Sequence, residues 1–133
     1  MGTLKTLLSI SAGASCGAIF RWFLGVWLNA LFPLIPLGTL CANALGGFLA
    51  GIALIVFTSM TDISPLWRIC IMTGFLGALT TFSAFSLEVW ELFQQQRLGW
   101  ALVLIASHLV GTLAALGAGV GMAQYGMRYF SYS

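Results

Sequence analysis

Four long apolar segments dominate this chain of 133 residues. They cover residues 7–28, 38–57, 65–93 and 99–122. Each can cross a hydrocarbon core of about 30 Å, which takes about 20 helical residues. Only 6% of the residues are charged, whereas a soluble domain has about 25%. Because a lipid-embedded backbone must satisfy its own hydrogen bonds, such segments fold as helices. We therefore expect an all-α membrane protein: one domain, residues 1–133, with four transmembrane helices.

The third segment contains an unusual run of glycines, hydroxyls and aromatic rings. Residues 74–88 read GFLGALTTFSAFSLE. Gly74 and Gly77 each lower helix stability by about 1 kcal/mol relative to alanine, and Thr80 and Thr81 add β-branched stiffness. These residues predict a break in the third helix near residues 77–81. Non-helical backbone at bilayer depth survives only inside protein or beside a polar cavity, so the break offers carbonyls to a cation or helix ends to an anion.

Two isolated polar residues lie in the first two segments. Arg21 either extends to the membrane edge beside Trp22 and Trp27, or faces a polar vestibule or fixes a loop by hydrogen bonds. Asn43 either hydrogen-bonds between helices or belongs to a polar pathway, and on the residues alone the first is favoured.

Small side chains predict close helix packing. The first segment begins with small residues that include Gly13 and Gly17, and Gly47 and Gly51 have the GxxxG spacing of helix contacts. The three cysteines lack a metal-ligand spacing, so we expect them to be small buried residues; they are Cys16, Cys41 and Cys70.

The remaining polar groups suit an ion rather than a catalytic reaction. No serine has an evident base and orienting acid, so we expect no enzyme. Phe82 and Phe85 are three apart and His108 and Thr112 four apart, so each pair shares a helix face. The two rings either pack in the core or turn their positive edges toward a small anion. Hydroxyls and amides can replace the water around a small ion without a buried charge.

The run over residues 74–88 closely resembles the signature of the Fluc (CrcB) fluoride channels. Three further features match this family: Arg21-Trp22 in the first segment, Gly38-Thr39-Leu40-x-x-Asn43 in the second, and the face of His108 and Thr112 in the fourth. The resemblance covers the whole chain in length and order of segments.

This resemblance implies a dual-topology antiparallel homodimer in the bacterial plasma (inner) membrane, with two fluoride pores and a central structural sodium ion. The backbone carbonyls of Gly77 and Thr80 would bind the sodium ion, Arg21 would serve the vestibule, and Glu88 would be a carboxylate at the pore end. The expected pore lining consists of Asn43, Phe82, Ser83, Phe85, His108 and Thr112. The partners are a second copy, fluoride and the lipid bilayer. No nucleic acid is expected, because the net charge is only +2 and no basic run exists.

Two features depart from the family pattern. Ala84 stands where many members have threonine, so one hydroxyl is missing. With the termini on one side, that side carries Lys5, Arg68 and Arg128 and the other only Arg97, a larger bias than strict dual topology favours.

Two alternatives to a channel remain. A small proton-coupled exporter of the multidrug transporter type is also a short four-span dual-topology dimer, but it needs a carboxylate deep in the first span, where this chain has Arg21. A membrane assembly subunit without transport would leave the hydroxyl cluster of the third segment unexplained.

Overall fold

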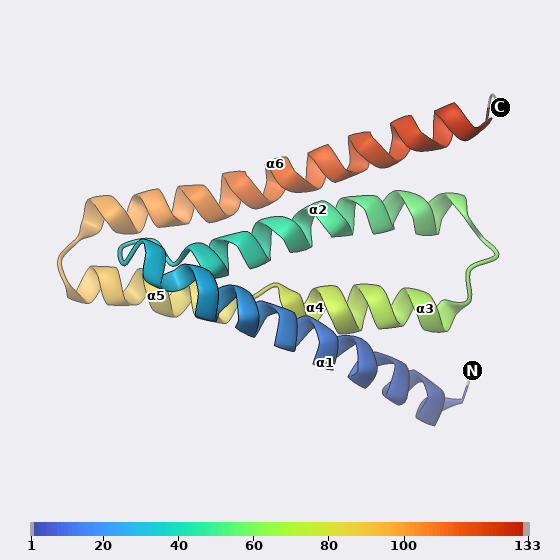
Figure 1. The fold of residues 1–133 in the computed structure, drawn as a ribbon, viewed down its shortest axis with the longest axis horizontal. Coiled ribbons are helices and arrows are strands. Elements are labelled where there is room, and N and C mark those ends of the chain that lie inside the picture. Colours follow the sequence, from blue (N-terminus) through green and yellow to red (C-terminus); the bar gives the residue numbers. More distant parts are fainter. Residues whose placement is uncertain (1, 132–133) are drawn as a thin grey trace.

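The structure, a computed structural model, describes residues 2–131, and within this range it is built from helices without a β-strand (Figure 1). Four helical units are long and apolar enough to cross a membrane, which confirms the expected all-α membrane fold. The elements in chain order are α1 (Thr3–Leu28), the 3₁₀ turn η1 (Asn29–Leu31), α2 (Leu37–Ser59), α3 (Pro65–Ile69), the π-helical segment η2 (Cys70–Leu76), α4 (Gly77–Leu79), α5 (Phe82–Gln94) and α6 (Leu98–Ser131).

The third span is interrupted twice. Its α-helical hydrogen bonding first changes to the wider π-helical pattern over η2, which the sequence did not lead us to expect. The helix then ends at Leu79, because Thr80 and Thr81 have extended backbone with ψ of 151° and 117°. A new helix begins at Phe82. The predicted break near the middle of the third span is thus confirmed.

A tight turn joins α1 to α2. The Asn29 side-chain oxygen accepts hydrogen bonds from the backbone N–H groups of Gly38, at 2.7 Å, and Thr39, at 3.3 Å. It thereby caps two N–H groups that have no partner in the first turn of α2. A Cβ atom on Gly38 would lie 2.7 Å from the Gly25 Cα atom. Only glycine allows α2 to begin this close to α1.

The α2 helix packs closely against α6 through glycines. A Cβ atom on Gly47 would lie 2.7 Å from the Thr112 carbonyl oxygen, and one on Gly51 would lie 2.9 Å from the Val120 backbone nitrogen. These separations are too short for a larger residue without a shift of backbone. The close contact predicted from the GxxxG spacing is therefore confirmed.

The α1 helix packs in the same way against the third span. A Cβ atom on Gly13 would lie 2.9 Å from the Phe75 backbone nitrogen, and one on Gly17 would lie 3.0 Å from that of Leu79. The small residues of α1 thus place this helix against η2 and α4. Figure 1 shows α1 running across this part of the third span.

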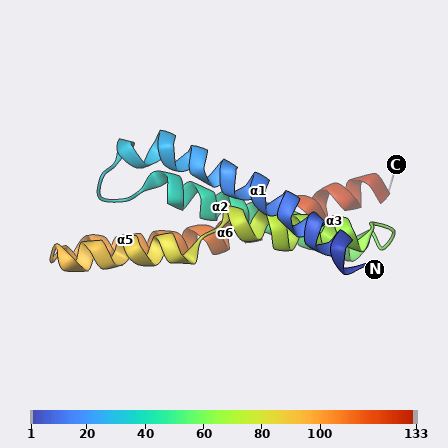
Figure 2. The same cartoon turned by 90° about the horizontal axis from the view of Figure 1, so that it is seen from below.

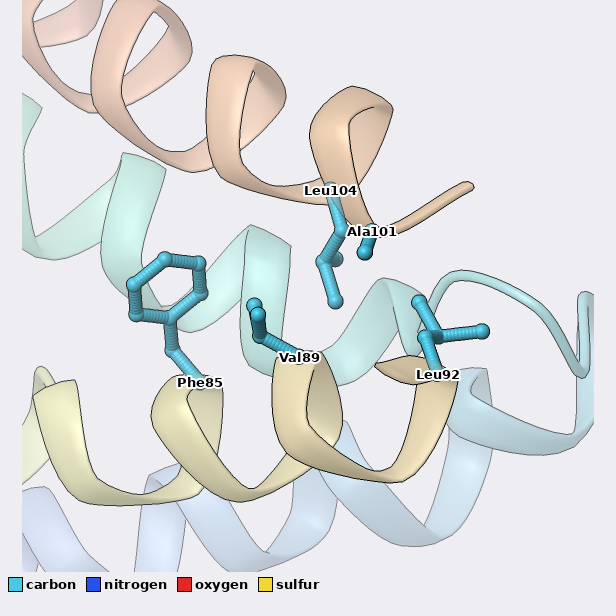
Figure 3. Close-up of a cluster of buried hydrophobic side chains, with 5 residues drawn as sticks. All are labelled: Phe85, Val89, Leu92, Ala101 and Leu104. Carbon is cyan, nitrogen blue, oxygen red and sulfur yellow. The ribbon is translucent and has the colours of Figure 1, made fainter. Parts of the chain in front are cut away.

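In the view of Figure 1, α2 lies between α6 and the row formed by α3, α4 and α5, whereas Figure 2 shows that beside α5 the α2 helix lies on the side of α1. Both ends of the described chain lie at the same end of the molecule in both views (Figures 1 and 2). An apolar cluster joins α5 to α6 at the opposite end (Figure 3). Its α5 residues follow a helical spacing of four and three, and the cluster consists of Phe85, Val89, Leu92, Ala101 and Leu104.

Many large apolar side chains remain exposed on the single chain. Trp22, Leu102 and Leu113 are 61%, 64% and 67% exposed, as expected for helix faces that contact lipid or another chain. The expectation of buried cysteines was wrong for two of the three. Cys16 and Cys41 are exposed and Cys70 is half-buried, because the first two lie on helix faces that no other part of the described chain covers.

Candidate functional site

The break in the third span is held by the side chain of Asn43 on α2. Its Oδ1 atom accepts a hydrogen bond from the Thr81 N–H at 2.7 Å, and its Nδ2 atom donates to the Thr81 carbonyl at 3.1 Å. The Thr81 hydroxyl in turn accepts from the Ala84 N–H at 3.1 Å and caps the start of α5. One asparagine therefore satisfies both backbone groups of Thr81, one of the two residues between the helix halves.

Arg21 on α1 supports the other side of the break. Its Nε atom donates to the Ala78 carbonyl at 3.0 Å. In an unbroken helix this carbonyl would accept a hydrogen bond from residue 82. The guanidinium also places positive charge at a helix C-terminus, where the helix dipole favours it. Of the alternatives for Arg21, the structure shows a hydrogen bond to the broken segment.

Two carbonyls at the break lack such a partner. The Thr81 N–H, which would reach the Gly77 carbonyl in a continuous helix, bonds to Asn43 instead. Within residues 2–131, no hydrogen bond from a side chain or from a loop N–H reaches the carbonyl oxygen of Gly77 or Thr80. Gly77 is also exposed. These two carbonyls thus differ from that of Ala78, which accepts a hydrogen bond from Arg21.

A cavity of about 320 Å³ opens beside the break, between α2, α5 and α6. Its lining combines an amide, three hydroxyls, an imidazole and two phenyl rings with two leucines, and it contains no lysine or arginine. The lining residues are Asn43, Thr80, Thr81, Phe82, Phe85, His108, Leu109, Thr112 and Leu113.

The three aromatic rings of the cavity contact one another in a row, with Phe85 between Phe82 and His108. Phe82 and Phe85 meet edge to face, with centroids 5.5 Å apart and an interplanar angle of 60°. The Phe85 ring lies 4.6 Å from the His108 ring. Phe85 is only 8% exposed and projects from α5 toward α6 (Figure 3), whereas Phe82 is 75% exposed. The single chain thus covers one ring and leaves the other open.

A second pocket, of about 530 Å³, lies between α1, α2 and α5. Arg21, Thr39, Ala84 and Glu88 line it. The Thr39 hydroxyl donates to Glu88 Oε1, while Glu88 Oε2 is buried without a hydrogen-bond partner in the described chain. Ala84 contributes a methyl group where a threonine would add a hydroxyl to this pocket.

The structure gathers most of the sequence-predicted site residues into these two pockets. Ser83 lines neither of them, and its hydroxyl lies 3.2 Å from that of Thr81. Thr81 was predicted only as part of the break and Thr39 only as part of a family motif, and neither was expected to line a pocket. Thr81 borders both pockets, and its place beside the predicted break was the signal for it. Thr39 could have been found because it lies one turn before Asn43 on α2.

Fold and site together define a multi-pass helical membrane protein with a cavity beside a broken helix, in which a few polar groups lie among aromatic and aliphatic side chains. Within residues 2–131, no group of three His, Cys, Asp or Glu side chains could hold a metal ion.

The chain belongs to the family described as CrcB-like protein, Camphor Resistance (CrcB), which matches residues 8–120. It is 53% identical over 118 residues to a protein of Desulfovibrio desulfuricans, covering 89% of this chain and 92% of the relative. It is 56% identical over 110 residues to one of Tolumonas auensis, covering 83% and 87%. It is also 50% identical over 121 residues to one of Chromobacterium violaceum, covering 91% and 96%. Each relative is named Fluoride-specific ion channel FluC. Their name is that of a channel and agrees with the expectation that this chain is not an enzyme.

Proposed function

We propose that this chain forms a fluoride-selective channel in the bacterial inner membrane. The observation that carries the proposal is the cavity beside the break, where hydroxyl, amide, imidazole and aromatic groups meet without a fixed cation. Fluoride is strongly hydrated, so a pore must replace much of its hydration as water is stripped away. A lysine or arginine in the narrow part would hold the anion too tightly to release it. The ion is inferred from the names of relatives that are about half identical to this chain in sequence.

The channel provides passive efflux. Hydrogen fluoride enters a cell in neutral form, dissociates and leaves fluoride trapped inside. A selective pore lets the anion leave down its electrochemical gradient, because the negative interior drives it outward, and this lowers fluoride toxicity. A proton-coupled exporter is not favoured, since neither α1 nor α2 contains a carboxylate.

The site residues divide between the two pockets. The cavity beside the break forms the narrow pore, and Ser83 lies next to its lining through Thr81. Arg21 and Glu88 belong to the second pocket, which serves as the vestibule and pore end. The pore lining is Asn43, Phe82, Phe85, His108 and Thr112.

Fluoride efflux from proteoliposomes tests the proposal. Wild-type protein should release fluoride rapidly and should not be slowed by excess chloride. Phe82→Ile and Phe85→Ile should sharply reduce efflux per folded protein, because isoleucine keeps an apolar surface but removes the ring edge. Normal efflux through both folded variants would remove the rings from the mechanism. Absence of fluoride efflux from folded wild type would refute the channel itself.

The working unit is an antiparallel homodimer. Phe82 is 75% exposed and Gly77 is exposed on the single chain. A second copy would cover these residues and close the open side of the cavity. The test is to tag the C-terminus and determine its side in intact cells. A tag found on one side of the membrane only would refute dual topology.

A sodium ion at the dimer centre completes this assembly. The carbonyls of Gly77 and Thr80 fit the role, since hard cations prefer oxygen ligands and these two accept no hydrogen bond from a loop or side chain of the described residues. The ion would neutralise the exposed carbonyl dipoles between the copies. Replacing sodium by N-methyl-D-glucamine throughout purification should weaken the dimer and the efflux. Unchanged dimer and efflux would refute the sodium role.

A further inference from the structure

The orientation of the Asn43 amide follows from its contact with Thr81. A backbone N–H can only donate, so the Asn43 atom 2.7 Å from the Thr81 nitrogen must be the oxygen. The amide nitrogen then has two contacts, with the Thr81 carbonyl at 3.1 Å and with His108 Nδ1 at 3.0 Å. Its two hydrogens are both used by these contacts. Asn43 therefore has no hydrogen left to offer an anion.

The same contact decides which nitrogen of His108 carries the ring proton. An amide nitrogen is a donor only, so His108 Nδ1 must accept and carries no hydrogen. In the neutral ring the proton then lies on Nε2. This Nε2 atom is buried and has no hydrogen-bond partner in the described chain. His108 is only 4% exposed, and it lines the cavity beside the break.

We propose that Asn43 is a positioning residue that fixes His108 as the Nε2–H tautomer, so that Nε2–H donates a hydrogen bond to fluoride in the cavity. The proposal rests on the proposed pore. Fluoride accepts hydrogen bonds and cannot donate one. The Nε2–H tautomer therefore attracts the ion, whereas the Nδ1–H tautomer would turn a lone pair toward it. Asn43 acts on the ion through the histidine and through the Thr81 backbone, not by its own amide.

The tautomer can be measured without transport. The chain contains one histidine, so labelling with ¹⁵N-histidine and removing any histidine tag leaves a single ring in the NMR spectrum. Wild type should show a protonated Nε2 and an unprotonated Nδ1. Asn43→Asp should shift the proton to Nδ1, because the carboxylate accepts where the amide donated. Ser107→Ala is the matched control and should keep the wild-type tautomer, since the Ser107 hydroxyl bonds to the Val103 carbonyl.

Efflux variants test the donor role. Glutamine can place an amide N–H near the position of Nε2, and asparagine can place one only near that of Nδ1. Fluoride efflux through His108→Gln should therefore be about tenfold faster, or more, than through His108→Asn. This is the factor expected for a hydrogen bond to a charged group. Asn43→Asp should lose efflux, and adding His108→Gln to it should restore part of the rate. Lack of such restoration would show that the new charge, not the tautomer, blocks the pore.

The possible failures are separable. A proton on Nδ1 in wild type would overturn the tautomer assignment and leave the proposed channel intact. Equal efflux through His108→Gln and His108→Asn would overturn the donor role alone. A wild-type protein with the expected tautomer but no fluoride efflux would refute the proposed function and with it the donor role.

Discussion

Gly17 provides a direct test of how α1 supports the break. A Cβ atom at this position would lie 3.0 Å from the Leu79 backbone nitrogen and closer still to the Phe75 carbonyl oxygen. Both obstacles are backbone atoms, which cannot rotate away as a side chain can. Gly17→Ala should therefore push α1 away from α4. Arg21 follows one turn later on the same face, so its hydrogen bond to the Ala78 carbonyl should lengthen as well.

The expected loss of stability can be worked out against a matched control. Gly117 lies in α6, and a Cβ atom there would meet nothing within 4 Å. Both alanine substitutions gain the same helix propensity, about 1 kcal/mol, so this term cancels in the comparison. Overpacking costs about 1–3 kcal/mol, and rigid backbone obstacles favour the upper part of that range. Gly17→Ala should thus be about 2–3 kcal/mol less stable than Gly117→Ala.

Unfolding in mixed micelles provides the assay. Wild type and both variants would be titrated with SDS at one protein concentration, since the stability of a dimer depends on concentration. Tryptophan fluorescence would report unfolding. Gly117→Ala should match or exceed wild type, and Gly17→Ala should unfold at a lower SDS fraction. Equal midpoints for the two variants would show that α1 does not depend on contact at Gly17.

Three further predictions follow from single hydrogen bonds. Asn29→Ala should destabilise the protein by about 0.5–2 kcal/mol in the same SDS titration, because it removes the cap of α2; no change would show that water caps the helix equally well. Thr39→Val should slow fluoride efflux while Thr39→Ser keeps it, since the valine leaves both carboxylate oxygens of Glu88 without a partner among the described residues; equal rates would exclude a role for this hydroxyl. Arg68→Gln should lower the SDS fraction at which half the protein is unfolded. The Arg68 guanidinium donates to the Phe57 carbonyl at 2.6 Å and lies 5.5 Å from the Phe57 ring. An unchanged midpoint would show that these two contacts do not stabilise the end of α2.

Local sequence was enough to predict the four spans and the break. Hydropathy identifies the spans because lipid leaves helices as the only fold for an apolar segment of this length. The break follows from glycines and β-branched threonines that lower helix stability at one place. The π-helical segment Cys70–Leu76 could not be predicted in this way. It lies against Gly13 of α1, a contact between residues distant in the sequence.

The site was predictable only in part, for a similar reason. Helical spacing places His108 and Thr112 on one face, and both line the cavity. It does not say which threonine at the break bonds to Asn43, nor that Ser83 lies outside the lining. Those outcomes depend on the backbone angles of Thr80 and Thr81 after the helix has ended. Resemblance to a family added the residue roles that spacing alone left open.

The close contacts and the polar groups of this chain share one spacing that explains how the break is held. Gly17 precedes Arg21 by four residues on α1, and Asn43 precedes Gly47 by four on α2. In each pair the two residues lie on one helix face. Gly17 allows α1 to approach the third span and Gly47 allows α2 to approach α6, and in each pair the polar side chain one turn away reaches the broken segment. A larger residue at Gly17 would withdraw Arg21 from the Ala78 carbonyl, which lipid cannot satisfy, and one at Gly47 would move Asn43 away from His108 on α6. In this chain the small residues are therefore part of the site, because they set the distance across which Arg21 and Asn43 act.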